Sequence, residues 1–147
     1  MKNVAENLLT DPNNKEDPPY SHQSVLVIDD NPDALELNKI LLGLAGYDVF
    51  TAESGEEAVQ VLSEINEPNL ILLDMKLGDM SGVEFLFILE EKNPEIIQHV
   101  PVVFLTGMNE VPETKAIGFI RKPADKDNFL KAVSQFIEMG NHPPYKL

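Results

Sequence analysis

Short, unbroken runs of apolar residues alternate along this chain with longer stretches in which apolar residues recur every three or four positions. The short runs are typical of strands buried on both faces of a parallel sheet, whereas the longer period is that of an amphipathic helix. Five runs predict strands, at residues 25–29, 47–52, 70–74, 100–106 and 116–122. Because helical stretches fill most of the intervals, the pattern predicts an α/β fold with helices on both faces of a parallel sheet.

The expected helices begin at residue types that cap helix N-termini. Asn31 precedes Pro32, and a capping-box spacing joins Ser54 to Glu57 and Ser81 to Glu84. A last helix is expected to start near Asp125 and to stop at Gly140. The interval between the fourth and fifth strands holds Pro112 and is short, which leaves little room for a helix there.

Polar, proline-containing segments flank the alternating pattern. We interpret residues 1–23 as a flexible arm and residues 140–147 as a short tail, with one domain at 24–139. The chain contains no cysteine and no apolar stretch that suits a signal peptide or a membrane span. These features predict a cytoplasmic protein without membrane association, disulfides or thiolate metal sites.

The chain of 147 residues carries a formal net charge of −14. An acidic surface without a basic stripe repels phosphate backbones, so we expect no binding to nucleic acid. Metal cations or basic patches on partner proteins are better candidates. The histidines, His22, His99 and His142, do not have the spacing of metal ligands.

Polar residues stand at the ends of four predicted strands. Asp29 and Asp30 end the first run, Asp74 the third, Thr106 the fourth and Lys122 the fifth. The carboxyl ends of the strands in an open parallel sheet form one edge, and ligands bind there. Three carboxylates gathered at one edge repel one another unless a cation lies among them. A site of oxygen ligands without histidine or thiol suits Mg²⁺ above all, with Mn²⁺ as the alternative.

A magnesium ion bound by carboxylates keeps positions open for phosphoryl oxygens. Thr106 and Lys122 would donate to the same oxygens, and Asp74 is the natural nucleophile for aspartyl-phosphate chemistry. Each of these residues alone is more often a turn, a cap or a surface charge. Their joint occurrence, each at the end of its own apolar run, favours the site.

Residues 24–139 resemble the receiver domain of two-component response regulators. The resemblance is carried by VIDDN (27–31), LLDMKLGDMSG (72–82), FLTG (104–107) and RKPAD (121–125). It implies a doubly wound, flavodoxin-like, five-stranded sheet of order 2-1-3-4-5. It also implies that Asp74 accepts a phosphoryl group from a histidine kinase or a histidine phosphotransfer protein, and that a downstream protein then recognises the change.

The same resemblance assigns roles to the residues around Asp74. It implies that Asp30, Asp74 and the main-chain carbonyl of Lys76 hold Mg²⁺, with Asp29 acting mostly through a bound water. Thr106 would move toward the phosphoryl oxygens. Lys122 would pair with the acids and later with the phosphate, and the peptide between Lys122 and Pro123 is expected to be cis.

This sequence departs from the family at several places. Gly78 stands where a proline is usual, which predicts a looser loop. Lys76 and Met108 lie two residues after Asp74 and Thr106, where family members tune the lifetime of the aspartyl phosphate. A lysine beside the phosphoryl group and an apolar side chain that hinders water predict slow self-dephosphorylation, although both could equally be ordinary loop residues.

The largest departure lies between Thr106 and Lys122, where the family has a complete fourth helix. Residues 107–116 are too few, so we expect this helix to be shortened or absent. The family signals and dimerises through the surface that this helix forms with the fifth strand and the last helix, so we expect partner binding to be altered. Phe119 stands at the aromatic switch position, and core packing is the favoured interpretation of this side chain.

Three functions fit these features. The favoured one is a receiver that signals by docking to another protein, without an output domain or enzymatic turnover of its own. A degenerate receiver, which binds partners regardless of phosphorylation, is the second. The third is a phosphatase of the haloacid dehalogenase type, but those enzymes carry Asp-x-Asp after the first strand, whereas Asp29 and Asp30 are adjacent.

Overall fold

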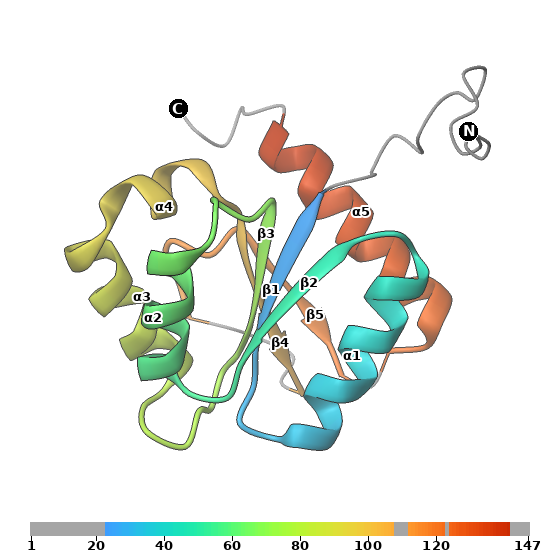
Figure 1. Ribbon diagram of the computed structural model, residues 1–147, viewed down its shortest axis with the longest axis horizontal. Helices are drawn as coiled ribbons and strands as arrows, with labels where there is room; N and C mark the ends of the chain where they lie inside the picture. Colours follow the sequence, from blue (N-terminus) through green and yellow to red (C-terminus); the bar gives the residue numbers. More distant parts are fainter. Residues whose placement is uncertain (1–22, 108–111, 123, 142–147) are drawn as a thin grey trace, which may run out of the picture.

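The protein forms a five-stranded parallel sheet of order β2-β1-β3-β4-β5 with helices on both faces (Figure 1). The computed structural model describes residues 23–107, 112–122 and 124–141. Its elements are β1 (Ser24–Ile28), α1 (Pro32–Leu44), β2 (Asp48–Ala52), α2 (Gly55–Glu64), β3 (Leu70–Asp74), α3 (Gly82–Lys92), α4 (Pro94–His99), β4 (Val102–Thr106), β5 (Gly118–Arg121) and α5 (Lys126–Asn141). Every neighbouring pair of strands is parallel. The predicted doubly wound fold and strand order are confirmed.

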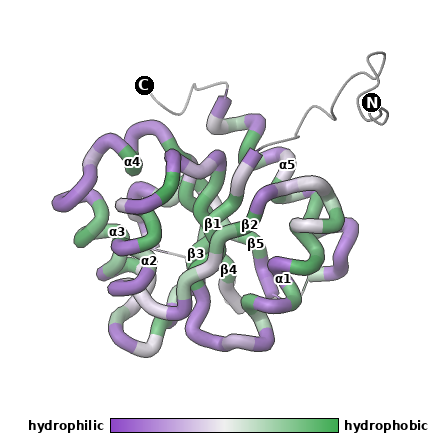
Figure 2. The backbone as a smooth tube through the Cα atoms, in the orientation of Figure 1, coloured by the Kyte–Doolittle hydropathy of each residue, from purple (hydrophilic) through white to green (hydrophobic). Residues whose placement is uncertain are grey.

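The two faces of the sheet carry separate layers of helices and separate halves of the core. Helices α2, α3 and α4 pack on one face, and α1 and α5 on the other. Residues 25–28 of β1 and 70–73 of β3 are fully buried because helices cover both faces of the sheet at these strands. Figure 2 shows hydrophobic residues in these central strands. Burial on both faces is why these strands read as unbroken apolar runs.

Side-chain caps begin the helices largely as predicted. Asn31 Oδ1 accepts hydrogen bonds from the main-chain N–H groups of residues 33 and 34. Ser81 and Glu84 form a complete capping box at the start of α3. At α2 the box is only half formed. Ser54 Oγ accepts from the N–H of Glu57, but the Glu57 carboxylate accepts from the N–H of Glu53 instead of that of Ser54.

The helix labelled α4 precedes β4 and was not predicted. It extends the crossover from β3 to β4 by a short segment with Pro94 at its first turn. After β4, Gly107 and residues 112–117 are not helical, and residues 108–111 lie outside the described part of the chain. The prediction that no complete helix connects β4 to β5 is therefore confirmed.

The C-terminal helix corrects one predicted boundary. Helix α5 continues through Gly140 to Asn141, so this glycine does not stop the helix. A Cβ atom at position 140 would lie 2.7 Å from Cγ of Pro101, and glycine is therefore needed for close packing. Gly46, in contrast, follows α1 with a φ of 102°, a conformation that favours glycine. No helix in the described ranges is long and apolar enough to cross a membrane.

Two phenylalanines of α3 provide a matched test of this packing. Phe85 is 0% exposed in the core, whereas Phe87, two positions later, is 66% exposed. We expect Phe85→Ala to lower the free energy of unfolding by about 3–5 kcal/mol, because it leaves a buried cavity. Phe87→Ala should change it by less than about 0.5 kcal/mol. Urea unfolding followed by circular dichroism measures both, and similar losses in the two variants would contradict the described orientation of α3.

Candidate functional site

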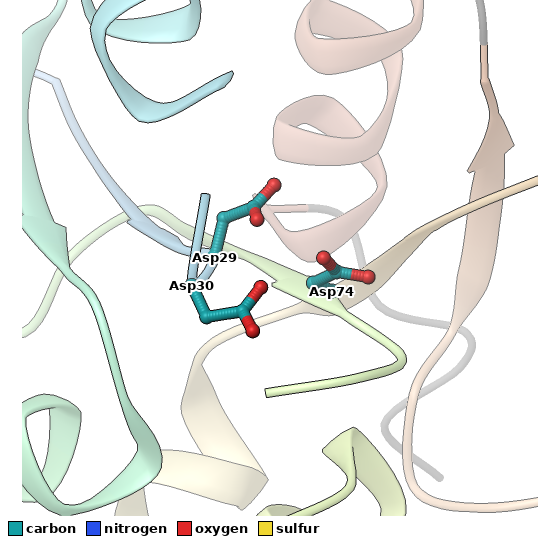
Figure 3. A group of neighbouring side chains, drawn as sticks. All are labelled: Asp29, Asp30 and Asp74. Atoms are coloured by element: carbon teal, nitrogen blue, oxygen red, sulfur yellow. The ribbon is translucent and has the colours of Figure 1, made fainter. Parts of the chain in front are cut away.

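The carboxyl ends of β1 and β3 bring three aspartates together. Asp29 and Asp30 follow β1, and Asp74 ends the neighbouring strand β3 (Figure 3). One carboxylate oxygen from each residue lies within 4.8 Å of the other two. The grouping predicted from the strand ends is therefore present, and its oxygen ligands suit a small divalent cation.

Asp29 is held rigidly at the base of this cluster. Its side chain is 1% exposed, and Oδ1 accepts a hydrogen bond of 3.0 Å from the N–H of Asn31. Its own N–H donates to the carbonyl of Ala52 over 3.1 Å. Oδ2 is buried, and no hydrogen-bond donor reaches it from the described residues. A buried carboxylate oxygen without a donor is costly, so a cation or its bound water would stabilise this atom.

Lys122 supplies positive charge at the same edge. Its Nζ lies 3.6 Å from Oδ2 of Asp29 and 3.6 Å from Oδ2 of Asp74. The N–H of Lys122 donates to the carbonyl of Thr106 over 2.7 Å, which fixes the backbone at the end of β5. The side chain is 42% exposed, so water screens its charge. One exposed ammonium does not balance three neighbouring carboxylates.

The electrostatics of Asp74 reflect this imbalance. Burial and the nearby charge of Asp29 raise the pKa of Asp74, and the opposing attraction of Lys122 does not reverse the shift. Oδ1 accepts a hydrogen bond of 3.3 Å from the N–H of Lys76. Asp74 is partly buried, so it is fixed in place but still reachable from solvent. A divalent cation would favour the charged carboxylate and lower this pKa.

The loop from Met75 to Ser81 is closed by its own backbone. The N–H of Leu77 donates to the carbonyl of Met80, and the N–H of Gly82 to that of Met75. Lys76 and Ser81 form an isolated antiparallel bridge. These contacts place the main chain of Lys76 immediately beside Asp74.

Gly78 brings the same loop close to the acidic cluster. A Cβ atom at this position would lie 3.6 Å from Oδ2 of Asp30, so the loop passes directly over that carboxylate. The looser loop expected from Gly78 stays a prediction.

Asp79 has a role that the sequence did not indicate. Its two carboxylate oxygens accept hydrogen bonds from the N–H groups of Gly55 and Glu56, at 3.0 and 3.1 Å. The loop after β3 is thereby tied to the N-terminus of α2, and the bond from Gly55 lowers the pKa of Asp79. A contact between residues 24 positions apart leaves no local pattern, which is why sequence reasoning missed it.

The predictions for Thr106, Met108, Pro123 and Phe119 differ in how they compare with the structure. Thr106 is buried at the end of β4, the strand next to β3. Met108 and Pro123 lie outside the described residues, so a role for Met108 and a cis peptide at Pro123 stay predictions. Phe119 is 36% exposed, and its assignment to the core is wrong. The side chain stays partly uncovered because none of the described residues between β4 and β5 forms a helix over it.

Comparisons with known proteins agree with this geometry. A family model described as the response regulator receiver domain matches residues 25–134. The transcriptional regulatory protein GlrR of Escherichia coli is 31% identical over 122 residues, which are 79% of this chain but only 26% of GlrR.

Two further relatives match over nearly their whole length. The polar-differentiation response regulator DivK of Brucella ovis is 28% identical over 78% of this chain and 96% of its own. The crystal structure of the response regulator TrrA from Thermotoga maritima, in complex with Mg²⁺ and BeF, superposes with a TM-score of 0.66. That match has 27% identity and covers 78% of this chain and 98% of TrrA.

Asp74 and Asp79 should give pH dependences of opposite sign. The raised pKa of Asp74 means that the folded protein holds the proton more tightly than the unfolded chain does, so stability falls as pH rises through the ordinary value and up to the raised one. In metal-free buffer Asp74→Asn should therefore be more stable than wild type at neutral pH, and the gain should vanish below about pH 4.

The lowered pKa of Asp79 has the reverse effect. Its carboxylate contributes stability at neutral pH, and this contribution is lost as pH falls through the folded pKa. Asp79→Asn should therefore destabilise the protein at neutral pH, with a smaller effect in acid. Thermal unfolding measured between neutral pH and about pH 4, with EDTA present, compares the stability of both variants with that of wild type. Parallel curves for the two would contradict the assigned environments.

Proposed function

This chain belongs to the response regulator receiver domain family, and we propose that it accepts a phosphoryl group on Asp74 from a phosphohistidine, assisted by Mg²⁺. The observation that carries the proposal is the cluster of Asp29, Asp30 and Asp74, in which the buried Oδ2 of Asp29 accepts no hydrogen bond from the described residues and has only the Lys122 ammonium 3.6 Å away to offset its charge. This arrangement is costly for a purely structural site and suits a site that binds a cation and then an anion.

The proposed reaction is a simple displacement at phosphorus. A carboxylate oxygen of Asp74 attacks the phosphorus, a P–O bond forms, and the P–N bond to the donor imidazole breaks with its electron pair going to nitrogen. Asp30, Asp74 and the carbonyl of Lys76 would hold Mg²⁺, with Asp29 acting through water. The ion would supply positive charge for the phosphoryl oxygens during transfer.

Lys122 and Thr106 would act on the product. Nζ of Lys122 already lies 3.6 Å from Oδ2 of Asp74, so it can pair with a phosphoryl oxygen after a small movement. Thr106 stands on the adjacent strand and could donate its hydroxyl to the same group. The phosphoryl group would add negative charge at Asp74, and both side chains would move toward it. This movement would shift the loops after β4 and β5.

The partners follow from the same chemistry. The phosphoryl donor is proposed to be a histidine kinase or a histidine phosphotransfer protein, and the signal is proposed to leave by docking to a downstream protein. Coverage of 96% of DivK, a response regulator, supports this for a chain of receiver size. The match to GlrR covers 26% of that protein, so it supports no function beyond that of the matched portion.

Acetyl phosphate tests the phosphoacceptor directly. With Mg²⁺ present, the intact protein should gain one phosphoryl group by mass, and Asp74→Asn should gain none. Asp79→Asn is the matched control, because it removes a carboxylate of the same loop that is engaged with α2, and it should still be modified. Modification of Asp74→Asn, or unchanged modification of wild type in EDTA, would refute the proposal.

The lifetime of the aspartyl phosphate tests the tuning residues. Lys76 lies next to Asp74, and its charge is proposed to neutralise the phosphoryl group, while Met108 hinders the attacking water. Lys76→Ala and Met108→Ala should therefore each lose the phosphoryl group severalfold faster than wild type, measured by mass after removal of acetyl phosphate. Decay at the wild-type rate in both variants would exclude these roles.

Beryllofluoride separates a switching receiver from a degenerate one. In the presence of Mg²⁺ it mimics the phosphoryl group on Asp74. Amide NMR signals of β4, β5 and their following loops should shift on its addition. A response confined to the immediate neighbours of Asp74 would favour a receiver that binds partners regardless of phosphorylation.

A further inference from the structure

The helical layer on one face of the sheet stops before it reaches β5. This face is covered by α2, α3 and α4, and the described residues between β4 and β5 add no helix to it (Figure 1). Phe104 of β4 is fully buried on this side, whereas Phe119, its partner in register on β5, is 36% exposed. No helix formed by the described residues therefore covers the outer flank of α3.

A groove follows this flank of α3. It has a volume of about 480 Å³ and lies between α3 and the bend at residues 113–115. Val83, Leu86 and Phe87 supply its apolar lining. Phe87 is 66% exposed, so most of its ring is available for contact with an occupant of the groove. We call this feature the α3 groove.

The polar lining of the α3 groove is acidic. Glu90 and Glu113 line it, and Glu91 lines an adjoining depression beside Phe87. Lys115, the one basic residue among the described residues of the lining, is already paired with Glu90, with Nζ and Oε2 3.6 Å apart. The lining keeps a net negative charge after this pairing, which favours an occupant that brings positive charge together with an apolar surface.

The negative charge of the groove argues against two possible occupants, a second copy of this chain and its own N-terminal segment. A second copy also carries a net charge of −14 over its whole chain, so the two copies repel each other. The segment 1–22 carries Lys2 and Lys15 but four acidic residues, so it is itself acidic. Neither complements the glutamates of the groove.

We propose that the α3 groove binds an amphipathic helix of another protein, with an apolar side chain seated against Phe87 and lysine or arginine residues facing Glu90 and Glu113. A helix in this position would extend the incomplete helical layer, and packing of helix against helix needs ridges such as those that Val83, Phe87 and Glu90 form on α3. The inference goes beyond the proposed phosphoacceptor function and does not depend on it, because none of the lining residues belongs to the acidic cluster.

A synthetic peptide provides the test. The probe is an amphipathic helix of about five turns with leucine on one face and lysine on the other, labelled with a fluorophore. A second peptide has the same leucines and glutamate in place of every lysine. We expect the lysine peptide to bind the full, unphosphorylated chain, with amide NMR shifts concentrated in α3 and residues 112–117, and the glutamate peptide to bind at least about tenfold more weakly.

Variants locate the binding. Phe87→Ser should weaken the lysine peptide about tenfold, whereas Leu44→Ser, at an 80% exposed leucine of α1, should not. The double variant Glu90→Gln/Glu113→Gln should weaken binding of the lysine peptide. The control double variant Glu36→Gln/Glu56→Gln removes the same charge outside the groove and should weaken binding less. Asp74→Asn should bind like wild type, so failure of the phosphoacceptor proposal and failure of this one are distinguishable.

Several results would overturn the proposal. Equal losses in the two double variants would indicate general attraction to an acidic protein, and no binding at about 1 mM peptide would exclude the site. A dimer in sedimentation that dissociates in Phe87→Ser would assign the groove to a second copy. Shifts of α3 amides on deletion of residues 1–22 would assign it to the chain's own N-terminal segment.

Discussion

Repulsion among Asp29, Asp30 and Asp74 is the constraint on which this structure depends. The sheet holds these carboxylates together because β1 and β3 are neighbours whose apolar residues are completely buried. The free energy gained by that burial offsets the cost of placing like charges at one edge. Lys122 reduces the cost only in part, since its ammonium is well exposed and lies 3.6 Å from its partners. An added cation would therefore stabilise this edge, whereas an anion without a cation would add to the repulsion.

The strand order converts this local constraint into a connected site. In the order β2-β1-β3-β4-β5, the residues ending β1, β3, β4 and β5 lie in succession along one edge. The register pairs Asp74 with Leu105, so Thr106 lies one residue beyond Asp74 on the neighbouring strand. The bond from Lys122 N–H to the Thr106 carbonyl then joins the last two strands. A change in charge at Asp74 is therefore adjacent to the ends of both β4 and β5.

The sequence predicted what local pattern and burial determine. Strands β1 and β3 were recognised because they are covered on both faces, and the acids at their ends followed from the parallel arrangement. The contact of Asp79 with α2, the glycine at 140 packed on Pro101 and the exposure of Phe119 were missed or misjudged. Each depends on which distant segment lies alongside, and a single sequence holds no local signal for that.

Helix α3 connects the acidic cluster to the α3 groove. Its first residue, Gly82, packs so closely on the strand end that a Cβ atom there would lie 2.5 Å from the carbonyl oxygen of Asp74. Its N–H is bonded to the carbonyl of Met75, so the start of the helix cannot move independently of the acceptor strand. The other residues of α3 that matter, Val83 and Phe87, lie within the next two turns and line the groove. Because a helix is stiff over so short a length, a single rigid element joins the acidic cluster to the α3 groove.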